Sequence, residues 1–398
     1  MVQFMLIAID AHNLEGSRTG VGVYLFRILN EWKKAYESGQ LSDFDFLLYF
    51  KKEIPEDILK MEVFDAKVLK APFGAQSNTL FTQWLIGRAT KKDKADILFS
   101  PNYTLPIFYK NGKTVVTIHD IIYEARPDLY NWPGILDKIF LRKNVRRSAE
   151  KADVILVPSN FTKQEIIKYY KIGADKIIVA PLAVSEDFLR KTDKNKITAV
   201  KRQYEIYDKY ALCVGSIFNR RHIPEIITAF KKIFPQFTDY QLVIIGSNYT
   251  RPYIDIEKDI LKTNQFLRNI LKIKNKLPII HRYFIEQQDL LELYKNAAVS
   301  IYLSDYEGFG LPLLESMASG TPVITSKQPA LIETAGDAAL FVQNNQNIDE
   351  TAEKMSAVFS NAVLREELKQ KGLDQVNKFS WSRCATQTLA VFKKLLAK

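Results

Sequence analysis

The chain has little cysteine, little histidine and no long apolar run. Of its 398 residues, two are cysteine and four are histidine. Cys213 and Cys384 lie in apolar settings without the spacing of metal ligands, so we expect buried, reduced thiols and exclude a disulfide-rich fold. The apolar runs are far shorter than the ~20 residues of a membrane helix. Residues 1–10 lack the basic start and cleavage site of a signal peptide. We therefore expect a cytoplasmic protein.

The composition is that of a globular protein with a basic surface. The chain is 47% hydrophobic and 25% charged, and 398 residues exceed what one core usually serves, so we expect two domains. The net charge of +11 favours an anionic partner, which is a nucleic acid, a membrane surface or a phosphorylated substrate. Because helix-turn-helix, zinc-finger and RNA-binding signatures are lacking, we predict no nucleic-acid partner.

The richest stretch is residues 299–325, VSIYLSDYEGFGLPLLESMASGTPVIT. Residues 299–303 form an apolar, β-branched run of strand length, and residues 305–310 have the composition of a loop. Pro312 suits the first turn of a helix, and Gly320 ends that helix before a further strand. This order brings a helix N-terminus directly after the carboxyl end of a strand.

This unit suits a ligand that carries both phosphate and hydroxyl groups. Gly308 and Gly310 let backbone approach a ligand, and the unpaired N–H groups of the helix N-terminus favour phosphate. Glu307 and Glu315 would repel phosphate, but they accept hydroxyl protons, so a diphosphate between two sugars would satisfy every group. A nucleotide-sugar has that constitution. Each glutamate alone is also explained as a helix-terminal charge or a solvated loop residue.

The frame EGFGLPLLE from Glu307 to Glu315, followed by ASGTPVI, resembles the donor-site signature of the retaining glycosyltransferases of family 4. The resemblance covers most of the chain except residues 248–276, and it implies the α/β GT-B fold, in which two Rossmann-like domains face each other across a cleft. It implies that Glu307 holds hydroxyls of the transferred sugar and Glu315 the ribose. The donor-binding residues it implies in this stretch are Glu307, Gly308, Phe309, Gly310, Leu311 and Glu315.

Strands and helices alternate in the first half of the chain, which predicts a parallel sheet with helices on both faces. The expected strands are residues 44–50, 67–71, 97–100 and 115–119. The last of them ends in TIHD, and ligands of open α/β sheets bind at carboxyl ends of strands. A lone histidine is more often structural, but this position favours chemistry. The resemblance makes His119 the residue that faces the donor sugar, with Asp120 orienting it.

Two further loops precede helices. Gly20 and Gly22 open an amphipathic helix, and the resemblance identifies RTGVGVY as the glycine loop that closes over the donor diphosphate. In GSIFNRRHIPEIITAF, Arg220 and Arg221 lie between a strand and a helix. An exposed basic loop is the alternative. The resemblance implies an Arg-Lys pair here that grips the diphosphate, with Gly215 also binding the donor. This chain departs in having Arg221, and also His222 where asparagine is usual.

The resemblance implies sugar transfer from a nucleoside diphosphate to an acceptor hydroxyl, with retention and without a metal or other cofactor. Electrostatic stabilisation of the leaving diphosphate is then the main catalytic term. The predicted catalytic residues are His119, Glu307, Arg220 and Arg221. The DFD triplet of Asp43 and Asp45 is interpreted as surface rather than as a metal site.

RTGVGVY and TIHD look closest to bacterial surface-polysaccharide enzymes, many of which are mannosyltransferases. This favours GDP-mannose as donor, ahead of a UDP-sugar, and a glycan or lipid-linked glycan as acceptor. The basic stretch at residues 138–151 predicts a helix whose outer face is either solvated or in peripheral contact with an anionic membrane. A GT-B sugar-nucleotide epimerase and a non-catalytic binding subunit are the alternatives. A Rossmann dehydrogenase is disfavoured because the GxGxxG fingerprint is lacking.

The expected domain organisation follows from these assignments. It comprises an acceptor-binding domain at residues 1–190, a polar linker at 191–209, a donor-binding domain at 210–378 and a closing helix at 379–398 that returns to the first domain. Residues 248–276 are longer and more charged than the connection usual in the family, and a helix is expected in their middle.

Overall fold

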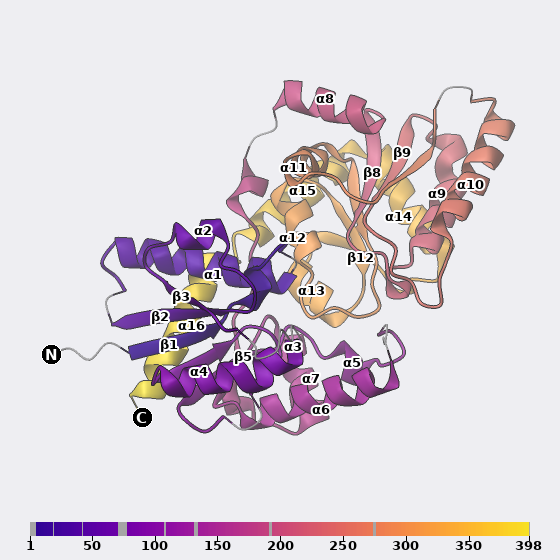
Figure 1. The fold of residues 1–398 in the computed structure, drawn as a ribbon. Coiled ribbons are helices and arrows are strands. Elements are labelled where there is room, and N and C mark those ends of the chain that lie inside the picture. Colours follow the sequence, from indigo (N-terminus) through magenta and orange to yellow (C-terminus); the bar gives the residue numbers. More distant parts are fainter. Residues whose placement is uncertain are drawn as a thin grey trace. The chain divides into compact units, whose positions relative to one another are not determined.

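The structure, a computed structural model, describes residues 5–18, 20–41, 43–70, 78–106, 109–130, 134–190, 193–273 and 276–397. The chain divides into two compact units (Figure 1). The first consists of Met1–Leu182 together with Ser380–Lys398, and the second of Ala183–Phe379. Each unit contains its own parallel sheet with helices between most of its successive strands, which confirms the predicted α/β class of two Rossmann-like units.

The first unit is built on a seven-stranded sheet in the order β3-β2-β1-β4-β5-β6-β7. All of its described strand pairs are parallel. Its core strands are rich in β-branched and aromatic residues that are buried on both faces, as expected of parallel sheets. The strands are β1 (Met5–Asp10), β2 (Phe44–Phe50), β3 (Asp65–Val68), β4 (Ile97–Ser100), β5 (Lys113–Thr117), β6 (Val154–Val157) and β7 (Ile177–Val179).

The helices of the first unit include α16 from the end of the sequence (Figure 1). They are η1 (His12–Leu14), α1 (Gly20–Glu37), α2 (Glu56–Leu59), α3 (Asn78–Leu80), η3 (Phe81–Leu85), α4 (Ile86–Lys92), α5 (Ile122–Ala125), α6 (Ile135–Lys151), α7 (Asn160–Tyr170), η4 (Ala174–Lys176) and α16 (Trp381–Leu396).

Helix α16 packs against α1 and closes the core of the first unit. The indole Nε1 of Trp32 donates to the Ala385 carbonyl at 3.1 Å. The ring of Phe392 lies against Trp32 and Phe99, at centroid distances of 5.8 and 5.5 Å. This aromatic cluster therefore joins residues from both ends of the sequence.

The second unit has a six-stranded parallel sheet in the order β10-β9-β8-β11-β12-β13. The strands are β8 (Lys209–Val214), β9 (Tyr240–Ile245), β10 (Ile279–Arg282), β11 (Val299–Tyr302), β12 (Val323–Ser326) and β13 (Ala339–Val342). From β8 the chain builds the sheet outward through β9 to β10, and it then returns to β11 and builds the other way. The strand order therefore reverses between β8 and β11.

Helices separate these strands. They are η5 (Glu186–Leu189), α8 (Lys194–Tyr204), η6 (Asn219–Arg221), α9 (Ile223–Ile233), η7 (Phe234–Gln236), α10 (Ile256–Leu271), α11 (Gln287–Asn296), α12 (Leu311–Ala318), α13 (Pro329–Ala335), α14 (Ile348–Ser360) and α15 (Ala362–Val376). Helix α10 is the helix expected within residues 248–276, and it contacts α9 and β10.

The segment expected to be a linker at residues 191–209 has a different structure. Residues 191 and 192 lie outside the described residues, and helix α8 occupies most of the rest within the second unit. Asp193 caps this helix by accepting from the backbone N–H of Asn195 at 2.9 Å. Helix α8 buries Ile197 and Val200 and packs on α11. These two buried side chains and the cap stabilise a helix whose other residues are mostly polar or charged.

Candidate functional site

Two loops of the second unit meet where its strand order reverses. Strands β8 and β11 are paired in parallel, so the loops that follow them, residues 215–222 and 303–310, leave the same edge of the sheet. The Asp305 backbone N–H donates to the Arg220 carbonyl at 3.1 Å, which joins the two loops directly. Open α/β sheets bind ligands at this kind of switch point.

The switch point gathers three of the predicted catalytic side chains. Arg221 Nη1 lies 3.1 Å from Glu307 Oε1, and Arg220 Nε lies 3.8 Å from the same oxygen. The Arg221 guanidinium also stacks on the Tyr302 ring at 4.1 Å from its centroid. Burial would lower the pKa of Arg221, but Glu307 and Tyr302 raise it above the usual value. Arg221 is therefore a permanent cation at the ends of β8 and β11.

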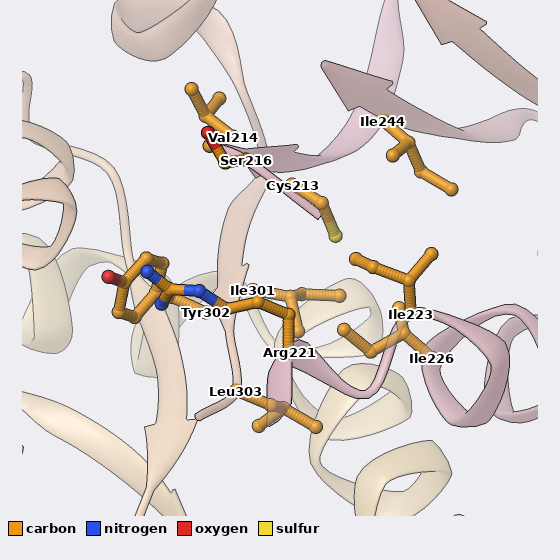
Figure 2. Close-up of a pocket in the computed structure, with 11 residues that line it drawn as sticks. Cys213, Val214, Ser216, Arg221, Ile223, Ile226, Ile244, Ile301, Tyr302 and Leu303 are labelled. Carbon is orange, nitrogen blue, oxygen red and sulfur yellow. The ribbon is translucent and has the colours of Figure 1, made fainter. Parts of the chain in front are cut away.

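A pocket lies beside this cation (Figure 2). The Arg221 guanidinium and the Tyr302 ring form one side of it, and Ile223 and Ile226 from α9 form the other. The Nε atoms of Arg220 and Arg221 are buried without a hydrogen-bond partner among the described residues. Because buried donors are normally paired, these atoms suit an added ligand with anionic oxygens.

Glu307 is held from two sides. The Ser304 hydroxyl donates to Glu307 Oε1 at 2.7 Å, and the Gln328 side chain donates to the Glu307 carbonyl at 3.3 Å. The Glu307 side chain is 15% exposed. The carboxylate is thus fixed in orientation while part of it stays accessible to a hydroxyl donor.

The N-terminus of α12 follows directly. Gly310 precedes the helix with φ at 106°, and a Cβ there would lie 2.7 Å from Leu331 Cδ2, so glycine is required. Within the described part of the chain, no side chain caps this helix. Among the described residues, no hydrogen bond is formed by the backbone N–H groups of Phe309, Gly310 and Leu311. These groups are available to an anion.

Glu315 lies one turn into α12, and its contacts differ from those of Glu307. Its Oε2 accepts from the Tyr294 hydroxyl of α11 at 3.2 Å. Burial raises the pKa of Glu315 to about 7, and the bond from Tyr294 offsets part of this effect. The two glutamates of the motif therefore differ in their electrostatic surroundings. Glu307 lies beside an arginine, whereas Glu315 has a neutral tyrosine partner and is poorly solvated.

The predicted glycines differ in their surroundings. Gly215, directly after β8, has φ at 124°, and no described atom lies within 4 Å of the position that a Cβ would occupy, so the described residues leave space for a ligand there. In the first unit, Gly20 is similarly open, whereas a Cβ on Gly22 would collide with the Asn13 carbonyl. Thr19 of the same motif lies outside the described residues.

His119 follows β5 in the first unit. Its Nε2 lies 3.0 Å from the Pro101 carbonyl, which can only accept, so Nε2 carries the proton and Nδ1 is the acceptor. The rings of Tyr24 and Tyr103 pack edge-on against it, at 4.9 and 5.6 Å. Burial lowers the pKa of His119 to about 4, against the opposing effect of the Pro101 bond. His119 is thus a neutral imidazole at physiological pH.

Asp120, which was expected to orient His119, contacts it only indirectly among the described residues. Asp120 Oδ2 accepts from the Tyr103 hydroxyl at 3.2 Å, and Oδ1 accepts from the Ile122 backbone N–H at 3.0 Å. Asp120 therefore acts on His119 through the Tyr103 ring, while the Pro101 carbonyl fixes the tautomer.

Several neighbours of the site were not predicted from the sequence. Four residues contact the site or its immediate neighbours without having been predicted: Tyr302, Ser304, Asp305 and Tyr294. The signals for them in the sequence were their positions, since three lie at the end of a strand and Tyr294 lies on the helix before it. Outside the site, Cys213 and Cys384 are free and buried, as expected.

The DFD triplet lies at the surface. Asp43 Oδ2 is 3.2 Å from Lys393 Nζ, and Asp45 is exposed. Within the described part of the chain, no cluster of three or more His, Cys, Asp or Glu side chains could hold a metal ion. No described helix is long and apolar enough to cross a membrane.

Two family models match the chain, one for each half. The model described as Glycosyltransferase Family 4 matches residues 19–188, and the model described as Glycosyl transferases group 1 matches residues 196–375. The second match contains the whole switch-point site.

Relatives and solved structures agree with these matches. The O-antigen chain mannosyltransferase B of Escherichia coli is 29% identical over 305 residues, which cover 76% of this chain and 76% of that protein. The serotype-specific mannosyltransferase WbdA of Escherichia coli is 26% identical over 306 residues, covering 75% of this chain and 36% of that protein. The crystal structure of Anabaena HepE in complex with UDP and glucose has a TM-score of 0.71 at 15% identity, covering 99% of this chain and 100% of that chain. The protein is a glycosyltransferase that belongs to the group 1 and family 4 glycosyltransferases and has the GT-B fold.

Proposed function

We propose that this enzyme transfers mannose from GDP-mannose to a hydroxyl of a glycan or lipid-linked glycan, with retention at the anomeric carbon, in surface polysaccharide synthesis. The observation that carries the proposal is the switch-point site. Arg220 and Arg221 lie against Glu307 there, Glu307 comes shortly before the N-terminus of α12, and Arg221 and Gly215 line a pocket. The curated relatives named above are mannosyltransferases, which supports mannose as the transferred sugar.

Each group has a role in this proposal. Arg220, Arg221 and the N-terminus of α12 neutralise the diphosphate, and Gly215 leaves room for it. Glu307 accepts from hydroxyls of the mannose, and Glu315 from those of the ribose. The second unit is then the donor-binding unit and the first the acceptor-binding unit. The loop of Gly20 and Gly22 is assigned to the diphosphate by the family resemblance.

The chemistry needs no separate base. In a front-face displacement the bond from the anomeric carbon to the leaving phosphate breaks, and the acceptor oxygen bonds to that carbon on the same face. A phosphate oxygen takes the acceptor proton. His119 is assigned to the transferred sugar by the family resemblance, and its neutral ring, with Nδ1 as acceptor, is suited to hydrogen bonding with a hydroxyl.

GDP is preferred to UDP only because the relatives are mannosyltransferases, while HepE was solved with UDP and glucose. We also propose that α6 brings the enzyme to an anionic membrane that holds the acceptor. Ile139 and Phe140 of α6 are 58% and 46% exposed, and Lys143 and Arg147 are exposed on the same helix.

A ligand panel tests the donor site. GDP, UDP, ADP and TDP with their common sugars would be compared by thermal shift and calorimetric titration, using wild type, Arg221→Ala and Glu307→Ala. Ligand at ~100 times its Kd should stabilise the protein by roughly 2.7 kcal/mol. Arg221→Ala should abolish the GDP-mannose shift, whereas Arg202→Ala, an exposed arginine of α8, should leave it unchanged. If no nucleotide binds wild type, the proposal is wrong.

Product analysis tests the reaction. With GDP-mannose and a mannan-type acceptor, NMR of the product should show the anomeric configuration of the donor. An inverted product would refute retention, and consumption of donor without a glycan product would favour an epimerase. Sedimentation with phosphatidylglycerol vesicles, compared with phosphatidylcholine vesicles, tests the membrane contact. Phe140→Asp with Lys143→Glu should release the protein, and Arg202→Glu should not.

A further inference from the structure

His222 occupies the junction between the loop after β8 and helix α9. Its backbone is left-handed, with φ at 54°, and its side chain is only 7% exposed. Nε2 lies 2.8 Å from Asp305 Oδ1 in the loop after β11, and Nδ1 lies 3.5 Å from Glu225 Oε1 in α9. Its side chain makes no capping hydrogen bond to α9, so helix capping does not explain it.

The contact with Asp305 continues to Glu307 through hydrogen bonds. Asn345 Nδ2 donates to Asp305 Oδ1 at 2.8 Å, and the Ser326 hydroxyl donates to Asn345 Oδ1 at 2.6 Å. Ser326 Oγ accepts from the Ser304 backbone N–H at 2.7 Å, and the Ser304 hydroxyl donates to Glu307 Oε1 at 2.7 Å. Most residues in this series of hydrogen bonds are buried or part-buried, so water competes little with these hydrogen bonds.

Arg221 closes this series of contacts into a ring. Arg221, adjacent to His222 in sequence, lies 3.1 Å from Glu307 Oε1. The ring therefore holds both the cation and the carboxylate proposed to meet the donor. The titratable groups that face the imidazole are Asp305 and Glu225. Burial would lower the pKa of His222, but these two carboxylates outweigh it and raise the pKa to about 9.

We propose that His222 is a positioning residue for donor binding: its imidazolium, held by Asp305, ties the loop that carries Arg221 to the loop that carries Glu307. This inference rests on the proposed function, because it assigns those loops to the donor. Asparagine, which is usual here in the family, would offer hydrogen bonds but no charge to Asp305. The two loops are thus held in their binding arrangement before the donor binds, and this arrangement requires that His222 be protonated.

The two partners of His222 provide a matched test. Asp305→Asn breaks the bridge between loops, whereas Glu225→Gln removes a carboxylate that contacts the same ring from its own helix. We expect His222→Gln and Asp305→Asn each to raise the Kd for GDP-mannose at pH 7 by at least about tenfold, because each removes one partner of a buried ion pair. Glu225→Gln should change it by less than about threefold. The double variant His222→Gln with Asp305→Asn should be no worse than either single variant.

A pH series on wild type needs no substitution. The affinity for GDP-mannose should fall as the pH rises through about 9, and the His222→Gln profile should lack that step. Rescue by His222→Lys, which restores a cation, should recover part of the affinity at pH 7. Calorimetric melting of every variant checks that it is folded.

The outcomes separate the two levels of the proposal. If wild type binds no nucleotide-sugar, the proposed function fails. If wild type binds GDP-mannose and His222→Gln binds it equally well, or if the pH profiles of the two superpose, the inference about His222 is overturned. Equal losses in Asp305→Asn and Glu225→Gln would overturn it as well, because the bridge between the loops would then not matter.

Discussion

Replacing Glu315 by glutamine should stabilise the second unit at alkaline pH and weaken donor binding at the same time. Glutamine keeps the size of the side chain and an oxygen that can accept from the Tyr294 hydroxyl. It removes a negative charge that lies in a poorly solvated place, where the neutral Tyr294 hydroxyl is its side-chain partner among the described residues. Such a cost in stability is expected of Glu315 if the ribose of the bound donor, which is absent from the free enzyme, is the group that its carboxylate binds.

The magnitude follows from the pKa. In the folded enzyme the pKa of Glu315 is raised from 4.5 to about 7, so between these values the folded state holds a proton that the unfolded state has lost. The free energy of unfolding therefore falls as the pH rises through this window, by at most about 3 kcal/mol at 1.36 kcal/mol per pH unit. Because the side chain is part-exposed, we expect about 1–3 kcal/mol. Glu315→Gln should recover this at pH 8 and gain nothing at pH 4.5.

Scanning calorimetry at pH 4.5, 6 and 8 is the appropriate assay. All four tryptophans lie outside residues 183–379, so tryptophan fluorescence would not report on the second unit. At roughly 2–4 °C per kcal/mol, the transition of that unit should rise by about 2–12 °C at pH 8. Affinity for GDP-mannose should fall by about tenfold or more, because the ribose loses a charged acceptor.

Glu307→Gln is the matched control from the same motif. Glu307 has Arg221 at 3.1 Å, so its neutralisation leaves a buried cation without its partner and should stabilise at no pH. An equal gain from both substitutions, or no gain from Glu315→Gln at pH 8, would refute the reasoning.

Three further predictions concern other parts of the chain. Gly310→Ala should destabilise the second unit by about 2–5 kcal/mol in calorimetry, because φ is 106° and the new Cβ meets Leu331 at 2.7 Å; Gly320→Ala, with φ at 72° and its nearest contact at 3.4 Å, should cost only about 1 kcal/mol. The pKa of His119 is lowered from 6.5 to about 4, so stability of the first unit should drop between these values on acidification. In denaturant titrations followed by tryptophan fluorescence, His119→Asn should lack up to about 3 kcal/mol of that drop. Burial raises the pKa values of Cys213 and Cys384 to about 12, so a thiol reagent should label neither thiol until the protein unfolds.

The strands were predictable because their signal is local. Residues 44–50 and 97–100 coincide with β2 and β4, since nearly all of their side chains are buried and aliphatic or aromatic. Helix α8 was missed for the opposite reason. Only a few of its side chains are buried, and its stability comes from the Asp193 cap and from packing on α11, which the sequence does not reveal.

The predicted site residues were chosen by motif, but their contacts depend on strand order. Arg221 meets Tyr302 and Glu307 only because β8 pairs with β11, and no local pattern encodes that pairing. The difference between Glu307 and Glu315 was equally hidden, because it depends on what each carboxylate contacts. A motif can therefore select candidate site residues, whereas their charge states depend on contacts that only the fold shows.

The return of α16 to the first unit has a consequence for synthesis. The second unit is continuous in sequence, so it can bury its core as soon as residue 379 has left the ribosome. The aromatic cluster around Trp32 cannot close until Phe392 has been translated. The unit that is made first is thus the one that is finished last, and during that delay the aromatic side chains that α16 later covers remain exposed to solvent.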